Sequence, residues 1–279
     1  MIFVNKKILA LIPLLLINVF SQNSKQQQYE YAYNLYVQEK FFDAITELKR
    51  LQFFDKENTF SFQTNLLIGK CYKKGAKFDD AVKYFTLAEI NAKNDSEYFE
   101  SQILNARTNI LRRANKQSER ILNKLLDDSR FIFKTREIKY WAGWNFMFSN
   151  QWQKAYQIFS EAGLDTTLAN LCKSVDDKLY SEKFAKYSSY LIPGFGQFYT
   201  GEYISGVLSL GWNILFGYLT INSFVEERAF DGIIIGNLLW LRFYSGNIQN
   251  AEKFVIQKNL QLSNNALEYL QKNFSGEKP

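Results

Sequence analysis

Histidine is absent from this chain of 279 residues, and cysteine and proline are scarce. Histidine is the usual general base near neutral pH and the commonest metal ligand. Its absence therefore excludes Ser-His-Asp and Cys-His catalysis, HExxH zinc sites and most zinc fingers. The two cysteines, Cys71 and Cys172, are far apart in the sequence and form no CxxC motif. We expect them to be buried small apolar residues, and the alternative is a disulfide formed after export.

Paired carboxylates are the remaining candidates for acid-base chemistry. Asp79–Asp80 and Asp127–Asp128 are adjacent pairs in segments with a helical pattern. Adjacent side chains on a helix diverge, so we interpret both pairs as solvated faces. No other arrangement of residues indicates catalysis. We therefore expect a protein that is not an enzyme and that holds no cofactor and no metal.

The excess of basic residues is small and is spread along the chain. The formal net charge is +6, but the lysines and arginines are interspersed with acids and form no long basic run. Nucleic-acid binding depends on a concentrated basic surface that displaces counterions, so we expect no nucleic-acid partner. The pattern indicates a solvated surface of mixed charge with a mild attraction to anionic lipid.

Residues 1–21 have the pattern of an export signal. Lys6 and Lys7 precede an apolar run from Ile8 to Phe20, which has the length of a signal-peptide core and is short for a membrane span. We predict cleavage after Ser21, and the alternative is an uncleaved membrane anchor. In either case the residues that follow are expected outside the cytoplasm.

From Tyr29 onward the apolar residues follow a helical period that breaks into short hairpins, which predicts an all-α fold. The clearest unit is LLIGKCYKKGAKFDDAVKYFTLAEI, with small and aromatic residues at Gly69, Tyr72, Phe78, Ala81, Phe85 and Ala88. Small residues let two antiparallel helices approach closely, and aromatic residues fill the space where the next pair stacks.

The same pattern recurs at a fixed spacing. The equivalents of Ala81 are Ala44, which lies 37 residues before it, and Ala155, which lies 74 residues after it. Because 74 is twice 37, one further unit fits in between. A degenerate unit is in register there, with Ala106, Ser118, Leu122 and Leu125.

These units resemble tetratricopeptide repeats over roughly residues 25–163, within a predicted domain of residues 22–187. The match departs from the family pattern because no unit carries the terminal proline, and because Ser118 and Leu125 replace alanines of the neighbouring unit. The alternative is a helical bundle without a repeat. The resemblance implies a curved surface that holds peptides or partner domains, so we expect protein binding.

Proline and glycine are concentrated in one region. Nine of the fourteen glycines lie between Gly194 and Gly246, and one of the three prolines is Pro193, in the stretch IPGFGQFYTG. We predict that Pro193 ends a helix, that Gly194 and Gly196 allow a tight reversal, and that Gly201 and Gly206 thin the next helix for packing. A phosphate-binding loop is not expected, because neither GxxxxGK[ST] nor GxGxxG is present.

Two apolar segments follow this stretch. Glu202 and Glu226 bracket 23 uncharged residues, which is enough for one membrane-spanning helix. The second segment, GIIIGNLLWLRFYSGN, has Asp231 before it and Arg242 within it. Eleven residues on a regular helix would put these two charges on nearly one face, which suggests either a pairing or a polar site. The tail over residues 250–279 has the spacing of an amphipathic helix.

The residues of this region resemble a recurrent two-helix membrane module of bacterial envelope proteins, related to the TM2 group and to DUF5683-like proteins. The resemblance covers about residues 190–260, and we place the module at residues 188–249. The residues that carry it are Pro193, Gly194, Gly196, Gln197, Tyr199 and Gly201, then Tyr244, Gly246, Asn247 and Ala251. It implies a protein embedded in a bilayer and often joined to repeats.

Two functions fit this organisation. The first is a membrane-anchored scaffold of the bacterial envelope, with the repeats exported to the periplasm to bind a partner protein. The alternative is a component of a transport or protein-insertion system, in which Asp231 and Arg242 line a polar path. If the signal is cleaved, the repeats lie outside the cytoplasm, the hairpin enters the membrane and returns, and the loop EERAFD faces the cytoplasm. That loop has one arginine against three acids, so the positive-inside rule gives this topology no support.

Overall fold

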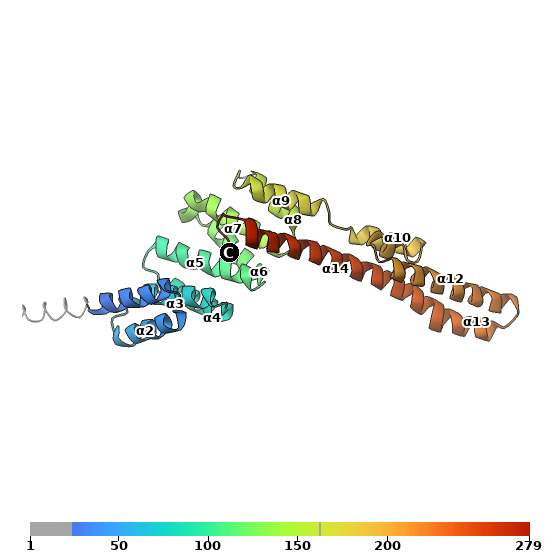
Figure 1. The fold of residues 1–279 in the computed structure, drawn as a ribbon, viewed down its shortest axis with the longest axis horizontal. Helices are drawn as coiled ribbons and strands as arrows, with labels where there is room; N and C mark the ends of the chain where they lie inside the picture. The colour runs from blue at the N-terminus through green and yellow to red at the C-terminus, as the bar shows by residue number, and fades with distance from the viewer. Residues whose placement is uncertain (1–23, 162) are drawn as a thin grey trace, which may run out of the picture. The chain divides into compact units, whose positions relative to one another are not determined.

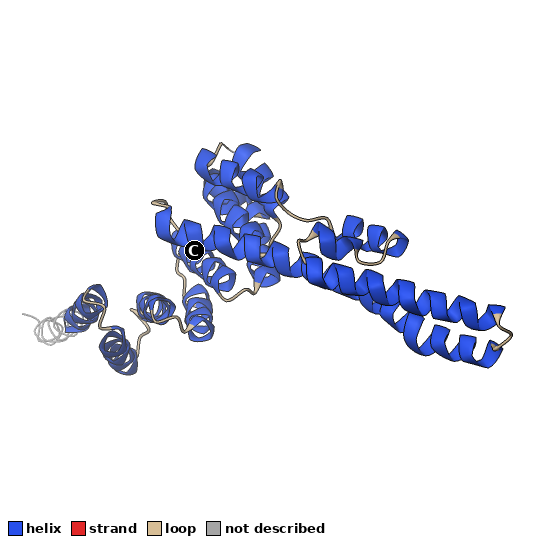
Figure 2. Cartoon of the chain, turned by 45° about the vertical axis from the view of Figure 1, so that its right-hand side comes forward, coloured by secondary structure: helices blue, strands red, loops and turns tan. Residues whose placement is uncertain are grey.

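The computed structural model describes residues 24–161 and 163–279. The predicted signal peptide and Ala162 therefore lie outside the described residues. Within the described ranges the chain is helical and contains no strand, so the predicted all-α class is confirmed (Figure 2). The chain separates into two compact units, with the division between Thr166 and Thr167.

The first unit is a series of helical hairpins. Its elements are a helix over residues 24–37, α2 (Phe41–Phe54), α3 (Ser61–Lys74), α4 (Phe78–Ile90), α5 (Asp95–Leu111), α6 (Asn115–Asp127), η1 (Ser129–Lys134), α7 (Thr135–Phe148) and α8 (Trp152–Glu161). The second helices of the hairpins are α2, α4, α6 and α8. The first residue of each lies 37 residues after the first residue of the one before it. The spacing predicted from the alanines is therefore also the spacing of the backbone.

The turn inside each hairpin repeats in the same way. Glu39, Ala76, Arg113 and Asn150 are 37 residues apart, and all have left-handed backbone angles, with φ of 60°, 56°, 62° and 60°. The amide of the residue after each one donates to the carbonyl five residues earlier, as from Lys77 N to Tyr72 O at 2.9 Å. This is the Schellman arrangement that ends a helix. The degenerate third unit uses it as well, so its altered side chains have not changed the hairpin.

Glycine is the residue that adopts the left-handed region at no steric cost, whereas other residues lose about 1–2 kcal/mol there. Ala76 has φ of 56°. We expect Ala76→Gly to stabilise the first unit by about 1 kcal/mol, measured as an increase in the free energy of unfolding in urea. Ala114→Gly is the matched control because Ala114 has φ of −85° in a neighbouring turn. Equal effects of the two changes would contradict the backbone account.

Small residues on the first helix of a hairpin face large ones on the second. A Cβ atom on Gly69 would lie 2.6 Å from the ring of Phe85, and a Cβ on Gly143 would lie 2.5 Å from the ring of Phe159. The two pairs are 74 residues apart, and all four residues are buried. The close approach expected of the small residues is therefore present at equivalent places in two hairpins.

The second unit consists of three short helices followed by a long hairpin. Its elements are α9 (Thr166–Asp176), α10 (Glu182–Leu191), α11 (Phe195–Tyr199), α12 (Tyr203–Val225), α13 (Ala229–Ile235), η2 (Gly236–Trp240) and α14 (Leu241–Asn273). The short segment η2 is π-helical, and the backbone stays helical from α13 into α14, with φ of −58° at Gly236 and −61° at Leu241. One continuous helix therefore forms the second arm of the hairpin and the tail.

The two arms of the hairpin pack in register over most of the length of α12. Successive neighbours run from the tip toward the base: Gly232 with Phe224, Gly236 with Thr220, Trp240 with Gly217, Phe243 with Phe216 and Trp212, and Asn247 with Ser209. Figures 1 and 2 show these two arms side by side. The second arm therefore lies beside α12 from Phe224 back to Ser209.

Candidate functional site

The glycine-rich motif forms a buried polar network around Asn247 in α14, whose side chain is 2% exposed. Its Oδ1 accepts hydrogen bonds from Gly194 N at 2.7 Å, Gln197 Nε2 at 3.1 Å and Ser209 Oγ at 2.9 Å. Its Nδ2 donates to the Ser189 carbonyl at 3.0 Å. One asparagine therefore links α10, α11, α12 and α14.

Three glycines of the motif have different structural roles. Gly194 has φ of +93°, and a Cβ there would collide with the Gly206 carbonyl. Gly196 has no room for a side chain, because a Cβ would lie 2.5 Å from Ala251 Cβ. Gly201 has φ of +80° with open space around it. The prediction that Gly201 thins α12 for packing is therefore wrong, and its role is to allow the turn.

The remaining motif residues lie around this network. Pro193 follows the end of α10, where Ile192 is extended with φ of −129°, as the residue before a proline prefers. The Tyr199 hydroxyl accepts from Ser181 N at 3.1 Å. Gly246 lies outside the network, and a Cβ there would meet no atom within 4 Å.

The outer surface of the hairpin is apolar on both arms. On α12 the exposed apolar residues include Ile204, Val207, Ile214, Tyr218, Ile221 and Val225, and on the second arm they include Phe230, Ile233, Leu238 and Leu241. No charged residue lies between Glu202 and Glu226. Helix α12 has 23 residues and contains an 18-residue stretch with a mean hydropathy of 1.5, so by length and composition it is long and apolar enough to cross a membrane.

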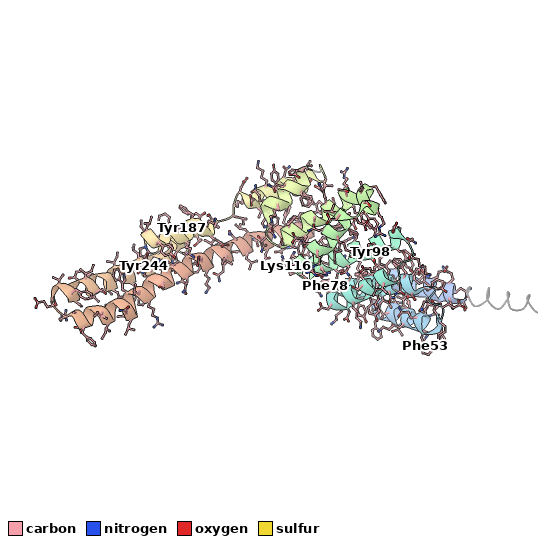
Figure 3. All side chains as sticks on the ribbon, turned by 180° about the vertical axis from the view of Figure 1, so that it is seen from behind. Phe53, Phe78, Tyr98, Lys116, Tyr187 and Tyr244 are labelled. Carbon is pink, nitrogen blue, oxygen red and sulfur yellow. The ribbon has the colours of Figure 1, made fainter. Side chains whose placement is uncertain are left out.

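Charged and aromatic residues collect at the base of the hairpin. Lys186 pairs with Glu252 at 2.7 Å, and Lys258 pairs with Glu202 at 3.2 Å. Tyr187 is exposed on α10, and Tyr244 donates to the Tyr190 carbonyl at 2.8 Å (Figure 3). Tyrosines with one polar end are typical of the interface between lipid and water.

Asp231 and Arg242 do not come together. Asp231 lies 3.8 Å from Arg228 at the tip of the hairpin, and Arg242 lies about three turns further along the same helix. Both side chains are exposed. The π-helical segment η2 lies between them, and its wider turn shifts the phase that a regular helix would give. We predicted that these two charges lie on nearly one face of a helix. In the structure they are separated along the helix axis.

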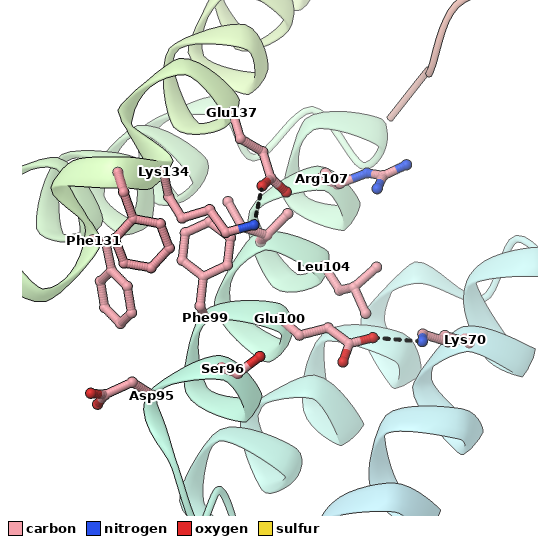
Figure 4. A pocket seen from close by; sticks show the side chains of 12 residues that line it. Lys70, Asp95, Ser96, Phe99, Glu100, Leu104, Arg107, Phe131, Lys134 and Glu137 are labelled. Carbon is pink, nitrogen blue, oxygen red and sulfur yellow. Dashed lines mark hydrogen bonds and ion pairs between the residues drawn. The ribbon is translucent and has the colours of Figure 1, made fainter.

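The first unit contains a groove of about 560 Å³ that α3, α5, η1 and α7 line (Figure 4). Its floor is apolar, with Phe99, Ile103, Leu104 and Phe131. Its walls carry both signs of charge, in the pairs Lys70–Glu100 at 2.8 Å and Lys134–Glu137 at 3.1 Å. Such a groove fits a segment with apolar side chains and scattered charges.

An exposed arginine holds one edge of this groove together. Arg130 pairs with Asp128 at 2.7 Å and also with Asp95, which lies 35 residues earlier. Its hydrogen bonds lower the pKa of the Asp128 carboxyl below the usual range. The guanidinium also lies 5.1 Å from the centre of the Phe131 ring. The arginine thereby ties η1 to the start of α5.

None of the groove residues was predicted as a binding residue from the sequence. Phe131 and Lys134 belong to η1, a 3₁₀ segment between α6 and α7 that has no counterpart in the other hairpins. The mostly apolar sequence FIFK within a charged stretch is the feature from which these groove residues could have been predicted. Among the described residues, no group of three or more acidic or cysteine side chains is placed to hold a metal ion.

The two cysteines are free and fully buried, as predicted. Burial raises the pKa of Cys71 and of Cys172 to about 12. The reactive thiolate is then about a thousand times rarer than at an ordinary cysteine near pH 8. We expect a maleimide to leave both thiols unmodified in the folded chain and to modify both in urea, as counted by mass spectrometry. Rapid labelling without urea would contradict the burial.

Comparison of the chain with protein-family models, with curated proteins and with solved structures found no match. The resemblances to tetratricopeptide repeats and to the two-helix membrane module therefore stay predictions.

Proposed function

We propose that this protein is a non-enzymatic scaffold of the bacterial envelope, anchored in a membrane by the hairpin, with exported repeats that bind a partner protein. The observation that carries the proposal is the exposed apolar surface along both arms of the hairpin. Large contiguous apolar surfaces are rare on soluble monomers and mark membrane or protein contacts. Since the second arm runs beside α12 almost to its base, a bilayer that α12 crosses would hold both arms.

The repeat period supports the binding role. Hairpins that stack at a constant period form extended surfaces, and such surfaces are suited to holding a partner chain. The groove on α3, α5, η1 and α7, with a volume of about 560 Å³, is a candidate surface for such a chain. Its apolar floor and paired charges favour an extended protein segment of mixed composition over a small anion or a nucleic acid.

Site-specific photo-crosslinking in intact cells tests this assignment. A photoreactive residue in place of Phe133, which is 78% exposed at the groove, is expected to cross-link to one partner protein. The same residue in place of Lys83, which is exposed on α4, is the matched control and is expected to give no such product. Adding Leu104→Arg in the groove should remove the Phe133 product. The same products at both positions, or no effect of Leu104→Arg, would contradict partner binding in the groove.

A further inference from the structure

The charges on the second arm of the hairpin have a regular spacing. Asp231 lies 11 residues before Arg242, and Glu252 lies 10 residues after it. At 1.5 Å per residue these steps are about 16 Å and 15 Å. Together they equal the thickness of a bilayer's hydrocarbon core, about 30 Å. If the arm spans the membrane, as the proposed function requires, Arg242 lies near the midplane.

Arg242 has no acidic partner within the described part of the chain. Its side chain is exposed, and the nearest charged groups along the helix are those at the two ends of the arm. The acids of the hairpin lie at its tip, in Glu226, Glu227 and Asp231, or at its base, in Glu202 and Glu252. An arginine at the centre of a membrane helix costs about 2.5–3.5 kcal/mol on insertion scales. The position therefore calls for a compensating group.

A second copy of this chain does not supply that group. Because Arg242 lies near the middle of the arm, both a parallel and an antiparallel pair of copies would bring arginine close to arginine. α12 offers only uncharged residues at every level between Glu202 and Glu226. A carboxylate that compensates Arg242 near the midplane would therefore come from another molecule.

The surface around Arg242 allows a helix to approach. One turn toward the tip is Leu238, which is 63% exposed. One turn toward the base are Ser245, which is exposed, and Gly246, where a Cβ would meet no atom within 4 Å. Small residues let membrane helices pack closely, and a polar side chain between them adds a directional contact.

We propose that this face, made by Leu238, Arg242, Ser245 and Gly246, binds a membrane-spanning helix of another protein that carries a carboxylate near the bilayer midplane. The carboxylate accepts from the Arg242 guanidinium, and the apolar and small neighbours pack against the helix on either side. The proposal rests on the proposed membrane hairpin and adds the kind of partner that the hairpin recognises.

The full chain in phosphatidylcholine liposomes tests the proposal by energy transfer to synthetic leucine-rich spanning peptides. One peptide has a single central aspartate, a second has leucine there, and a third has the aspartate seven residues nearer one end. We expect about tenfold tighter binding of the first peptide than of the other two. Arg242→Leu should abolish the difference, Arg242→Lys should retain most of it, and Arg228→Leu at the tip should leave it unchanged.

Each contrary outcome has a distinct meaning. Equal binding of all three peptides by the wild-type chain overturns the proposal, and this is the result expected if Arg242 reaches lipid phosphates instead. Self-association that depends on Arg242 and excludes the peptides also overturns it, in favour of a second copy. If added protease cleaves α12 throughout in the liposomes, the chain has not inserted, and the proposed membrane hairpin fails together with this inference.

Discussion

Asn247→Leu is expected to destabilise the second unit by about 3–5 kcal/mol. Leucine removes a side chain that accepts from Gly194 N, Gln197 Nε2 and Ser209 Oγ and donates to the Ser189 carbonyl. Each buried group left without a partner costs about 1–3 kcal/mol. The second unit should then unfold at a much lower denaturant concentration in detergent micelles, as measured by circular dichroism and limited proteolysis.

Asn237→Leu is the matched control for this change. Asn237 lies on the same helical arm, but its side chain is exposed and donates only to the Ile233 carbonyl one turn earlier. We expect this variant to unfold close to wild type. If Asn247→Leu also unfolded close to wild type, the network around Asn247 would not hold the four helices together.

Ile214→Arg is expected to reduce membrane insertion of the hairpin about 100-fold. Ile214 is 63% exposed at the middle of α12, so an arginine there would face lipid. The exchange of an apolar residue for arginine at a helix centre costs about 3 kcal/mol on insertion scales. The fraction of the chain that stays in membranes after carbonate extraction measures the effect.

Tyr203→Arg is the control, since Tyr203 is similarly exposed but lies at the first residue of α12. An arginine at that end reaches the headgroups, so extraction should resemble that of wild type. A chain that stays in solution with or without Ile214→Arg would show that the apolar surface serves a contact other than lipid.

The period of the first unit could be predicted because it depends on local residue types. Ala44, Ala81 and Ala155 are completely buried where the second helices pack on the first. The spacing holds in the third hairpin, where Ser118 takes the place of alanine and is also completely buried. A small side chain at this position was therefore a sufficient signal, whatever its chemical type.

The boundaries of α12 could also be predicted, since the helix runs over the 23 uncharged residues between Glu202 and Glu226. The grouping of Gly194, Gln197 and Asn247 came from the resemblance, and spacing alone gave no reason for it. The physical reason is a single amide that bonds to backbone and side-chain groups 50 or more residues earlier. The spacing of residue types along the chain does not predict a contact between positions so far apart in the sequence.

Two features depend on geometry that the sequence pattern does not contain. The relation between Asp231 and Arg242 was inferred for a regular helix, and the π-helical segment η2 lies between them. The groove in the first unit depends on η1, whose short 3₁₀ turns place Phe131 beside Phe99 of α5. Neither a π turn nor a 3₁₀ segment has a strong signature in residue type.

Cysteine accessibility in intact cells tests the membrane hairpin most directly. Single reporter cysteines would replace Lys83 on α4, Arg228 at the tip of the hairpin and Lys272 near the end of α14, after Cys71 and Cys172 are replaced by alanine. A reagent that does not cross the inner membrane should label the positions of Lys83 and Lys272 and should leave that of Arg228 unlabelled until the cells are broken. Labelling of all three positions in intact cells would contradict a hairpin that crosses the membrane and returns.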